Sequence, residues 1–165
     1  MKKIKIVVVG LGYVGLSNAL LLAQKNRVTA VDIDTDKVKL INKKKSPLSD
    51  QEMDSFLANE TLDLKVTLPS NEFFENSDIA LISTPTNYDE NSNCFNTDSV
   101  EETIKIALSK NPNITIIIRS TVPVGFTDQM IERYQTNNIY FVPEFLREGR
   151  ALNDSLNPSR IIIGG

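Results

Sequence analysis

"VVVGLGYVGLSNALLLA", residues 7–23, leads from an apolar run through three glycines into a second, helix-like apolar run. Gly10, Gly12 and Gly15 are spaced G-x-G-x-x-G, as in turns that join a buried strand to a helix. In such a turn the first glycine allows a sharp exit from the strand, and the third lets the helix pack closely on the sheet. The second lets a pyrophosphate approach the backbone, where the helix N-terminus offers free N–H groups and the positive end of its dipole. The stretch therefore predicts a strand, a turn and a helix, and the turn suits a nucleotide.

Strand-like and helix-like segments alternate along the rest of the chain. Short apolar runs predict strands at 4–9, 28–33, 64–68, 79–83, 114–118, 139–142 and 159–163. Helices are predicted at 13–25, at about 35–43 with Thr35 or Asp36 as cap, after Ser49 with a capping box to Glu52, and at 70–76, 97–110 and 126–134. A polar loop is predicted at 87–96. This alternation predicts an α/β fold, a Rossmann doubly wound parallel sheet with helices on both faces.

Composition limits the function classes. The chain has 165 residues, enough for one domain, and is 41% hydrophobic with a net charge of −3. The negative charge argues against nucleic acid or an anionic membrane as a partner. We find no signal peptide and no run of transmembrane length, so we expect a cytoplasmic protein. The absence of histidine excludes a Ser-His-Asp triad, a Cys-His dyad and His-ligated zinc, and we expect no metal. Cys94 is interpreted as an incidental loop cysteine, because no base lies near it in sequence.

An acidic residue ends the second predicted strand. Asp32 lies twenty residues after Gly12, where a carboxylate binds the hydroxyls of an adenosine ribose and repels a 2′-phosphate. The pair predicts a dinucleotide site that favours NAD over NADP. Two alternatives stay open: Asp32 only caps the helix near Thr35, or the turn binds S-adenosylmethionine, whose enzymes also use a glycine-rich turn and a strand-end acid.

Three further strand ends carry polar side chains: "STPT" at 83–86, "RSTVPVG" at 119–125 and "PEFLREG" at 143–149. Because the carboxyl ends of parallel strands meet at one sheet edge, we expect these segments to surround one site. Hydroxyls of the first two would contact a dinucleotide or order a water, and the third would add two carboxylates and an arginine. The alternative is ordinary turn chemistry, with a salt-bridged surface helix at 144–150.

The chain resembles the N-terminal part of the UDP-glucose/GDP-mannose dehydrogenase family. The resemblance rests on "VVGLGYVGLSNALLLA", "VDID", "STPTNYD", "RSTVPVG" and "VPEFLREGRAL…NPSRIIIGG", which occur in this order over essentially the whole chain. "PEFLREG" is more specific than the glycine turn and favours the UDP-glucose and GDP-mannose branches, and "PTNYD" favours UDP-glucose. The resemblance implies oxidation of the C6 alcohol of a sugar nucleotide to a carboxylate, with two NAD+ reduced.

The resemblance also implies roles for single residues. The residues that would contact NAD, including the three turn glycines, are Gly10, Gly12, Tyr13, Val14, Gly15, Asp32, Lys37, Thr84, Thr121 and Glu148. The catalytic residues would be Thr121, which helps to order the catalytic water, Glu144, which takes part in activating it, and Glu148, which approaches the nicotinamide. The sugar nucleotide would contact Glu144, Phe145, Leu146, Arg147 and Glu148.

The chain departs from the family at its end. Members continue into a central helix and a second domain, which holds the UDP-sugar site and the nucleophilic cysteine with its lysine, asparagine and aspartate partners. Residues 1–165 therefore correspond to the NAD-binding domain alone, and we expect this chain to bind NAD without turnover. The resemblance implies a homodimeric parent held largely by the central helix, so a dimer of this chain would be incidental. A domain of the GDP-mannose branch and a stand-alone, non-enzymatic NAD-sensing module stay open.

Overall fold

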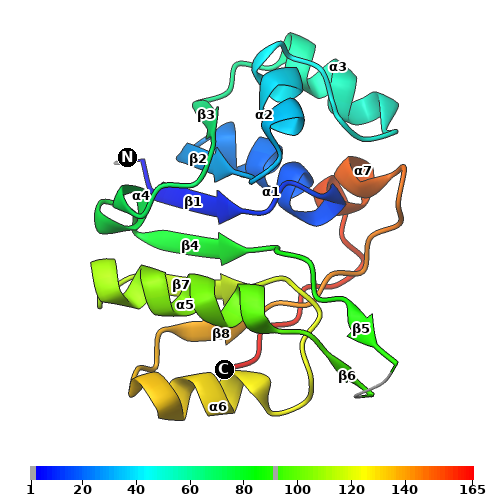
Figure 1. The fold of residues 1–165 in the computed structure, drawn as a ribbon. Helices are drawn as coiled ribbons and strands as arrows, with labels where there is room; N and C mark the ends of the chain where they lie inside the picture. The colour runs from blue at the N-terminus through cyan, green and yellow to red at the C-terminus, as the bar shows by residue number, and fades with distance from the viewer. Residues whose placement is uncertain (1–2, 91–92) are drawn as a thin grey trace.

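A computed structural model describes residues 3–90 and 93–165 of the chain (Figure 1). Its centre is a six-stranded parallel sheet in the order β3-β2-β1-β4-β7-β8. The strands are β1 (Lys5–Val9), β2 (Arg27–Val31), β3 (Leu64–Thr67), β4 (Ile79–Ile82), β7 (Thr115–Ile118) and β8 (Ile139–Phe141). The strand order reverses between β1 and β4, so the predicted Rossmann topology is confirmed.

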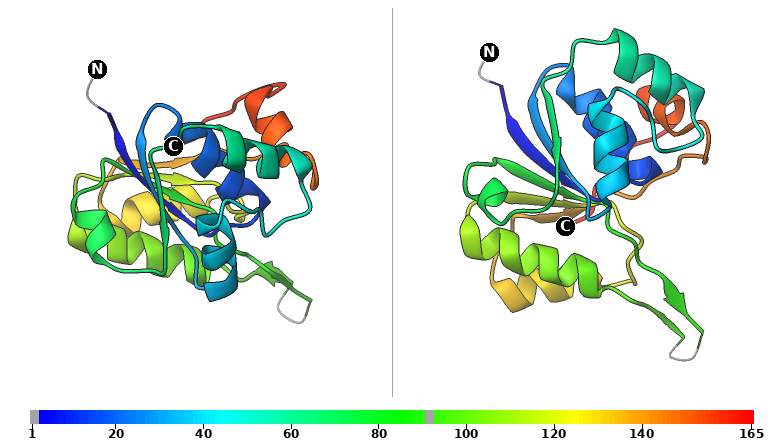
Figure 2. Two further views of the ribbon diagram at one scale, coloured as in Figure 1. Left: turned by 90° about the horizontal axis from the view of Figure 1, so that it is seen from above. Right: turned by 45° about the horizontal axis from the view of Figure 1, so that its top comes forward.

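Helices cover both faces of this sheet (Figures 1 and 2). They are α1 (Tyr13–Ala23), α2 (Thr35–Asn42), α3 (Gln51–Asn59), α4 (Glu72–Glu75), α5 (Asp98–Lys110), α6 (Phe126–Tyr134) and α7 (Ala151–Leu156). Buried side chains of α1, α2, α3 and α7 share one hydrophobic cluster, and those of α4, α5 and α6 share another. Because the two clusters lie on opposite faces of the sheet, the doubly wound arrangement follows directly from packing.

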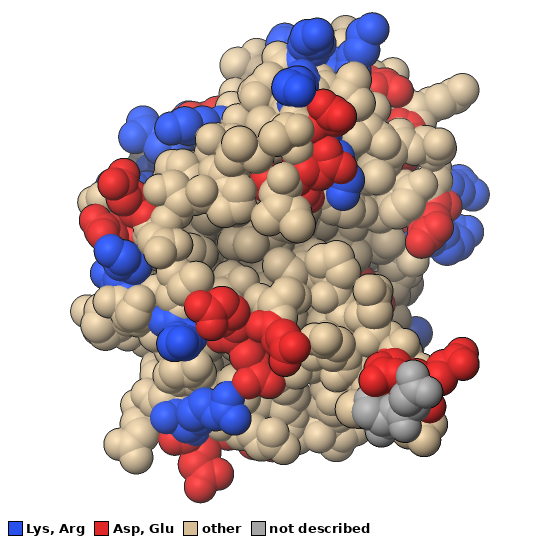
Figure 3. All heavy atoms as spheres, in the orientation of Figure 1, with Lys and Arg blue, Asp and Glu red and all other residues tan. Residues whose placement is uncertain are grey.

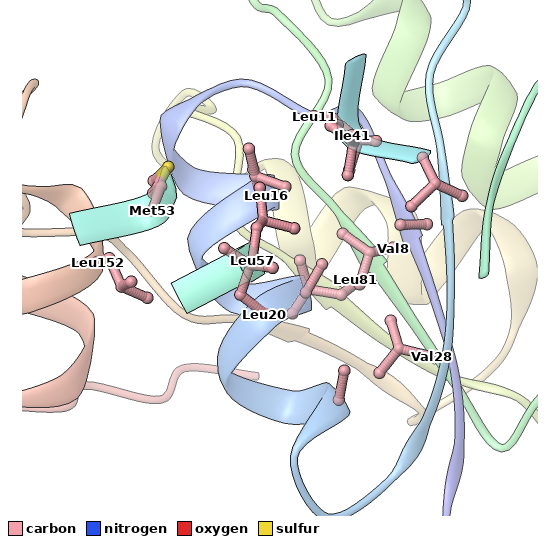
Figure 4. Close-up of a cluster of buried hydrophobic side chains, with 14 of the residues drawn as sticks. Val8, Leu11, Leu16, Leu20, Val28, Ile41, Met53, Leu57, Leu81 and Leu152 are labelled. Atoms are coloured by element: carbon pink, nitrogen blue, oxygen red, sulfur yellow. The ribbon is translucent and has the colours of Figure 1, made fainter. Parts of the chain in front are cut away.

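Strand β1 shows how the sheet divides the core. Ile6 and Val8 belong to the cluster under α1, whereas Val7 belongs to the cluster under α5, as the two-residue period of a strand requires. All three are buried. Figure 4 shows the first cluster, where Leu16 and Leu20 of α1 lie among side chains of β1, β2, β4, α2, α3 and α7. This packing fixes α1, and with it the glycine turn, against the sheet.

Two helix caps differ from the prediction by one residue. Asp34, not Thr35 or Asp36, caps α2, because its Oδ1 accepts hydrogen bonds from the N–H groups of Asp36 and Lys37 at 2.9 and 3.2 Å. Asp50, not Ser49, caps α3 in the same way. In both cases an aspartate carboxylate beside the predicted residue takes the free N–H groups of the first turn.

The C-terminal segment contains the largest error of the sequence prediction. Residues 159–163 do not form a strand, and the side chains of Ile161 and Ile163 are 70% and 67% exposed. Only Gly164 pairs with the sheet, in an antiparallel bridge to Phe141 at the edge of β8. The run of isoleucines at 161–163 predicted a strand, but these side chains are exposed rather than buried against the sheet.

Two elements were not predicted. The polar loop contains a short hairpin of β5 (Tyr88–Asp89) and β6 (Cys94–Phe95), which projects from the body of the molecule (Figure 2). Residues 91 and 92 of that loop lie outside the described residues. Helix α7 was also missed, since its six residues are too few to show a helical period. Among the described residues, no helix has the length and apolar character needed to cross a membrane.

Candidate functional site

A cavity of about 880 Å³ opens at the carboxyl ends of the strands, on both sides of the switch between β1 and β4. Its wall includes the glycine turn after β1, the segment after β2, the end of β4 and one face of α5. Acidic side chains gather over α5 on the face seen in Figure 3, and Glu102 of that helix lines the cavity. Ligands of open α/β sheets bind at this place.

The glycine turn has one residue where a side chain could be added and two where it could not. Gly10 has a φ of +89°, and a Cβ there would lie 2.6 Å from the carbonyl oxygen of Ser83. A Cβ on Gly15 would collide with the carbonyl oxygen of Gly10. A Cβ on Gly12, by contrast, would meet nothing within 4 Å. The turn therefore packs tightly on the sheet through Gly10 and Gly15 and leaves open space over Gly12.

The open space over Gly12 has the properties of an anion site. Gly12 is the N-cap of α1, no described side chain caps the helix, and its first turn holds no acidic residue. The first N–H groups of a helix have no partner within the helix, so they are available to a ligand here. The hydroxyl of Ser83, at the same edge, is buried without a hydrogen-bond partner among the described residues. The residues present therefore fit a dinucleotide pyrophosphate.

Asp32 is fixed at the wall of this cavity. Its side chain is buried, and its Oδ2 accepts a hydrogen bond from the N–H of Leu11 at 2.7 Å. Its Oδ1 accepts from the N–H of Asp34 at 2.9 Å, and Lys37 Nζ lies 3.7 Å from Oδ2. Because Asp34 caps α2, the interpretation of Asp32 as a helix cap is wrong. A carboxylate tied to the turn and beside a lysine suits a ribose diol.

A second cavity, of about 440 Å³, lies on the other side of Glu144. Glu144 and Leu146 line both cavities. Glu144 forms an ion pair with Arg119 and accepts a hydrogen bond from Asn18 Nδ2 at 3.2 Å. Burial lowers the pKa of Arg119 to about 10, so its guanidinium stays charged at neutral pH. A carboxylate is thus held, by two donors, in the wall that separates the cavities.

The segment that supplies Glu144 is irregular. Residues 142–148 form neither helix nor strand, so the alternative interpretation of 144–150 as a surface helix is wrong. Arg147 instead hydrogen-bonds Asp154 of α7 through Nε at 3.0 Å and Nη2 at 2.7 Å, and its N–H donates to the same carboxylate. The segment is therefore anchored to α7, which packs on α1.

The structure brings most of the candidate residues to these two cavities. The first is lined by Gly10, Gly12, Tyr13, Val14, Asp32, Lys37, Thr84, Glu144, Leu146 and Glu148. The second is lined by Glu144, Phe145, Leu146 and Arg147. Gly15 is buried beneath the turn, and Thr121 is exposed after β7 and lines neither cavity.

Sequence reasoning missed the wall formed by α4 and α5 and the role of Asn18. Ser99 of α5 donates to Thr84 Oγ1 at 2.9 Å and also contacts the carbonyl of Pro85, which joins α5 to the end of β4. Asn18 is a buried amide in α1, where Ser17 is the other buried polar residue. A polar residue at such a position needs a partner, and that signal could have singled it out.

The chain is similar to known proteins over nearly its whole length. The model of the UDP-glucose/GDP-mannose dehydrogenase family, NAD binding domain, matches residues 4–165. The UDP-glucose 6-dehydrogenases of Streptococcus pneumoniae and Campylobacter jejuni are 46% and 48% identical to this chain, each over 97% of it. The chain spans 41% of the length of each of those relatives.

Solved structures are similar over the same region. A UDP-glucose dehydrogenase from Pyrobaculum islandicum, 24% identical, covers 99% of this chain with a TM-score of 0.84 and shares its fold. A GDP-mannose dehydrogenase from Pseudomonas aeruginosa, solved as a ternary complex, is 26% identical over 96% of this chain with a TM-score of 0.80. The matched parts are 41% and 40% of those two chains.

Proposed function

We propose that this chain, which belongs to the UDP-glucose/GDP-mannose dehydrogenase family as an NAD-binding domain, is part of a UDP-glucose 6-dehydrogenase. The observation that carries the proposal is one cavity that joins an open, uncapped helix N-terminus to the strand-end carboxylate of Asp32. The choice of UDP-glucose is supported by 46% and 48% identity to two enzymes named UDP-glucose 6-dehydrogenase. Residues 1–165 would form the NAD-binding domain, and the UDP-sugar domain would lie outside this chain.

NAD is the cofactor of this family domain, and when bound it supplies a hydride acceptor. The N–H groups that follow Gly12 would hold its pyrophosphate. Asp32 would accept hydrogen bonds from the adenosine ribose, with Lys37 beside it. The carboxylate would also repel the 2′-phosphate of NADP, so the site favours NAD. Tyr13, Val14 and Thr84 line the remaining wall.

The proposed reaction converts the C6 alcohol of UDP-glucose to the carboxylate of UDP-glucuronate. The reaction would consume two NAD+ as hydride acceptors and one water, which supplies the second carboxylate oxygen, and it would release two NADH and three protons. The nucleophilic cysteine would be provided by the part of the protein beyond this chain. This domain would contribute the cofactor site and the groups that handle water.

Glu144 is the residue of this chain that is best placed to handle that water. It faces both cavities, so a water between cofactor and sugar would lie within its reach. The ion pair with Arg119 and the hydrogen bond from Asn18 fix the position of the Glu144 carboxylate, and a carboxylate can accept a proton from water. Thr121 lines neither cavity, so its assignment to orienting the water is supported by the family resemblance alone. Glu148, on the wall of the first cavity, is assigned to the nicotinamide side. Phe145, Leu146 and Arg147 would contact the sugar nucleotide.

The longer protein is proposed to be a cytoplasmic homodimer that uses a UDP-sugar and has no nucleic-acid partner. This chain alone would bind NAD and would not oxidise UDP-glucose. A complete, non-enzymatic NAD sensor is the alternative, and it predicts that the gene ends after Gly165. Reading the gene beyond that codon therefore separates the two.

Calorimetry tests the cofactor. We expect NADH to bind this chain, NADPH to bind at least tenfold more weakly, and S-adenosylmethionine not to bind; binding of S-adenosylmethionine alone would contradict the proposal. NADH formation from NAD+ and UDP-glucose tests the domain assignment. The longer protein should form two NADH for each UDP-glucose, and this chain none. Turnover by this chain at the rate of a full-length enzyme would contradict the assignment.

A further inference from the structure

The second cavity has an unpaired positive charge on its wall. Its charged lining residues are Arg119, Glu144, Arg147, Asp154 and Arg160. Glu144 pairs with Arg119, and Asp154 pairs with Arg147. Arg160 has no carboxylate partner within residues 3–90 and 93–165. Three arginines against two carboxylates leave one positive charge on this wall, although the whole chain carries a net charge of −3.

Arg160 is held in place by an aromatic ring. The guanidinium carbon lies 4.5 Å from the ring centroid of Phe145, which also lines the cavity. A guanidinium over an aromatic face is stabilised by the ring quadrupole while its N–H groups stay free. Those N–H groups form a planar fork that matches the oxygens of a phosphate. The arrangement therefore offers donors that no described group uses.

The backbone on both sides of Arg160 is also anchored. Helix α7, which packs on α1, ends at Leu156, four residues before it. Four residues after it, the N–H of Gly164 donates to the carbonyl of Phe141 at 2.9 Å, and the carbonyl of Gly164 accepts from the N–H of Phe141 at 2.7 Å. The segment between these anchors is short, and Pro158 restricts it further. Arg160 is thus kept near the cavity.

We propose that Arg160 binds the diphosphate of the sugar nucleotide in the second cavity, with Phe145 as its support. This inference rests on the proposed function, which places the sugar nucleotide beside Glu144. It assigns Arg160 a role in substrate binding, separate from the NAD site, because Arg160 does not line the first cavity. A sugar nucleotide and inorganic pyrophosphate would both present phosphate oxygens to Arg160.

The test compares two single substitutions that remove the same charge. Arg160→Gln removes the proposed donor, and Arg150→Gln is the matched control, because Arg150 is exposed and lines a different cavity beside α3. Each substitution is made in the longer protein, which includes the UDP-sugar domain, and UDP-glucose is titrated into it by calorimetry, with and without NADH. We expect Arg160→Gln to weaken UDP-glucose binding by about tenfold or more, as for the loss of a charged hydrogen bond, and Arg150→Gln to leave it unchanged. Arg160→Lys should show an intermediate loss, since it keeps the charge and loses the fork.

The NADH titration separates this inference from the proposed function. NADH should bind all variants equally, and thermal unfolding should show that each is folded. If NADH fails to bind while UDP-glucose still depends on Arg160, the inference stands and the cofactor proposal fails. If UDP-glucose binds Arg160→Gln as it binds the wild type, or does not bind the wild type at all, the inference is overturned. Equal, Arg160-dependent binding of inorganic pyrophosphate and UDP-glucose would overturn the sugar-nucleotide assignment.

Discussion

Asn18 of α1 donates a hydrogen bond from Nδ2 to Oε1 of Glu144 over 3.2 Å, although 126 residues separate the two in sequence. The same Nδ2 donates to the carbonyl of Val14, one turn earlier on α1, at 2.8 Å. Helix α1 therefore begins at the glycine turn and, through its next turn, holds the Glu144 carboxylate of segment 142–148. The helix whose N-terminus faces the first cavity therefore also fixes Glu144, which lies between the two cavities.

A double-mutant cycle should detect this link. Asn18→Ala, Glu144→Ala and the double variant are compared by urea unfolding. Because the single changes each remove the same partly buried hydrogen bond, we expect a coupling energy of about 1 kcal/mol. Ser17→Ala with Glu144→Ala is the control cycle, since Ser17 bonds Val14 and Ser155 instead. Additive free energies in the Asn18 cycle would show that the contact does not form.

Substitution by alanine should affect stability at Gly15 and NADH affinity at Gly12. Gly15→Ala places a methyl group against the carbonyl of Gly10, so we expect unfolding to become easier by about 3 kcal/mol or more. Gly12→Ala meets no protein atom, so stability should change by less than about 1 kcal/mol. NADH affinity should nevertheless fall at least tenfold in Gly12→Ala, because the methyl group fills the space of the pyrophosphate. Denaturation and calorimetry measure the two effects, and unchanged NADH binding in Gly12→Ala would contradict the phosphate assignment.

Asp32→Ala should weaken NADH binding by about ten- to hundredfold, the cost of charged hydrogen bonds to a ribose. It should also narrow the preference for NADH over NADPH, since the repelling carboxylate is gone. Asp36→Ala is the matched control, because Asp36 lies four residues away, pairs only with Lys39 among the described residues, and does not line the cavity. Calorimetry with both nucleotides provides the measurement. The ribose role fails if the two variants bind NADH equally well.

The Arg147–Asp154 pair should make stability depend on acid pH. The hydrogen bonds from the Arg147 side chain, and then from its N–H, lower the pKa of Asp154 from 3.8 to about 2. The unfolded state therefore binds more protons between these values, and the stability that the pair contributes is present above about pH 4 and lost as the pH falls toward 2. Denaturant unfolding of the wild type and Asp154→Asn should give a difference that is constant above pH 5 and shrinks below pH 4. A difference that does not change with pH would rule out this contribution.

The sheet could be predicted from sequence because its strands are buried on both faces. Uninterrupted apolar runs at β1, β4 and β7 leave few other structures, and the G-x-G-x-x-G spacing fixed where α1 begins. Asp32 could be placed beside the turn for the same reason, since parallel neighbours end at the same edge. The resemblance added Lys37, whose place beside Asp32 no pattern in the sequence indicates.

Side-chain partners across the chain could not be predicted. The pairs Asn18–Glu144 and Arg147–Asp154 depend on where an irregular segment crosses α1 and α7, and irregular backbone has no period to read. The isoleucines at 161–163 show the opposite failure, in which a clear apolar pattern is not buried. Burial depends on which other elements pack against a segment, and the sequence of the segment alone does not show which elements these are.

The bridge between Gly164 and Phe141 has a consequence for solubility. Strand β8 is an outer strand of the sheet, and its free side carries backbone donors and acceptors that could pair with another copy of the chain. Gly164 occupies two of those groups, at Phe141, with its own N–H and carbonyl. A chain shortened before Gly164 would expose them, and we expect it to aggregate through this edge more readily than the chain described here.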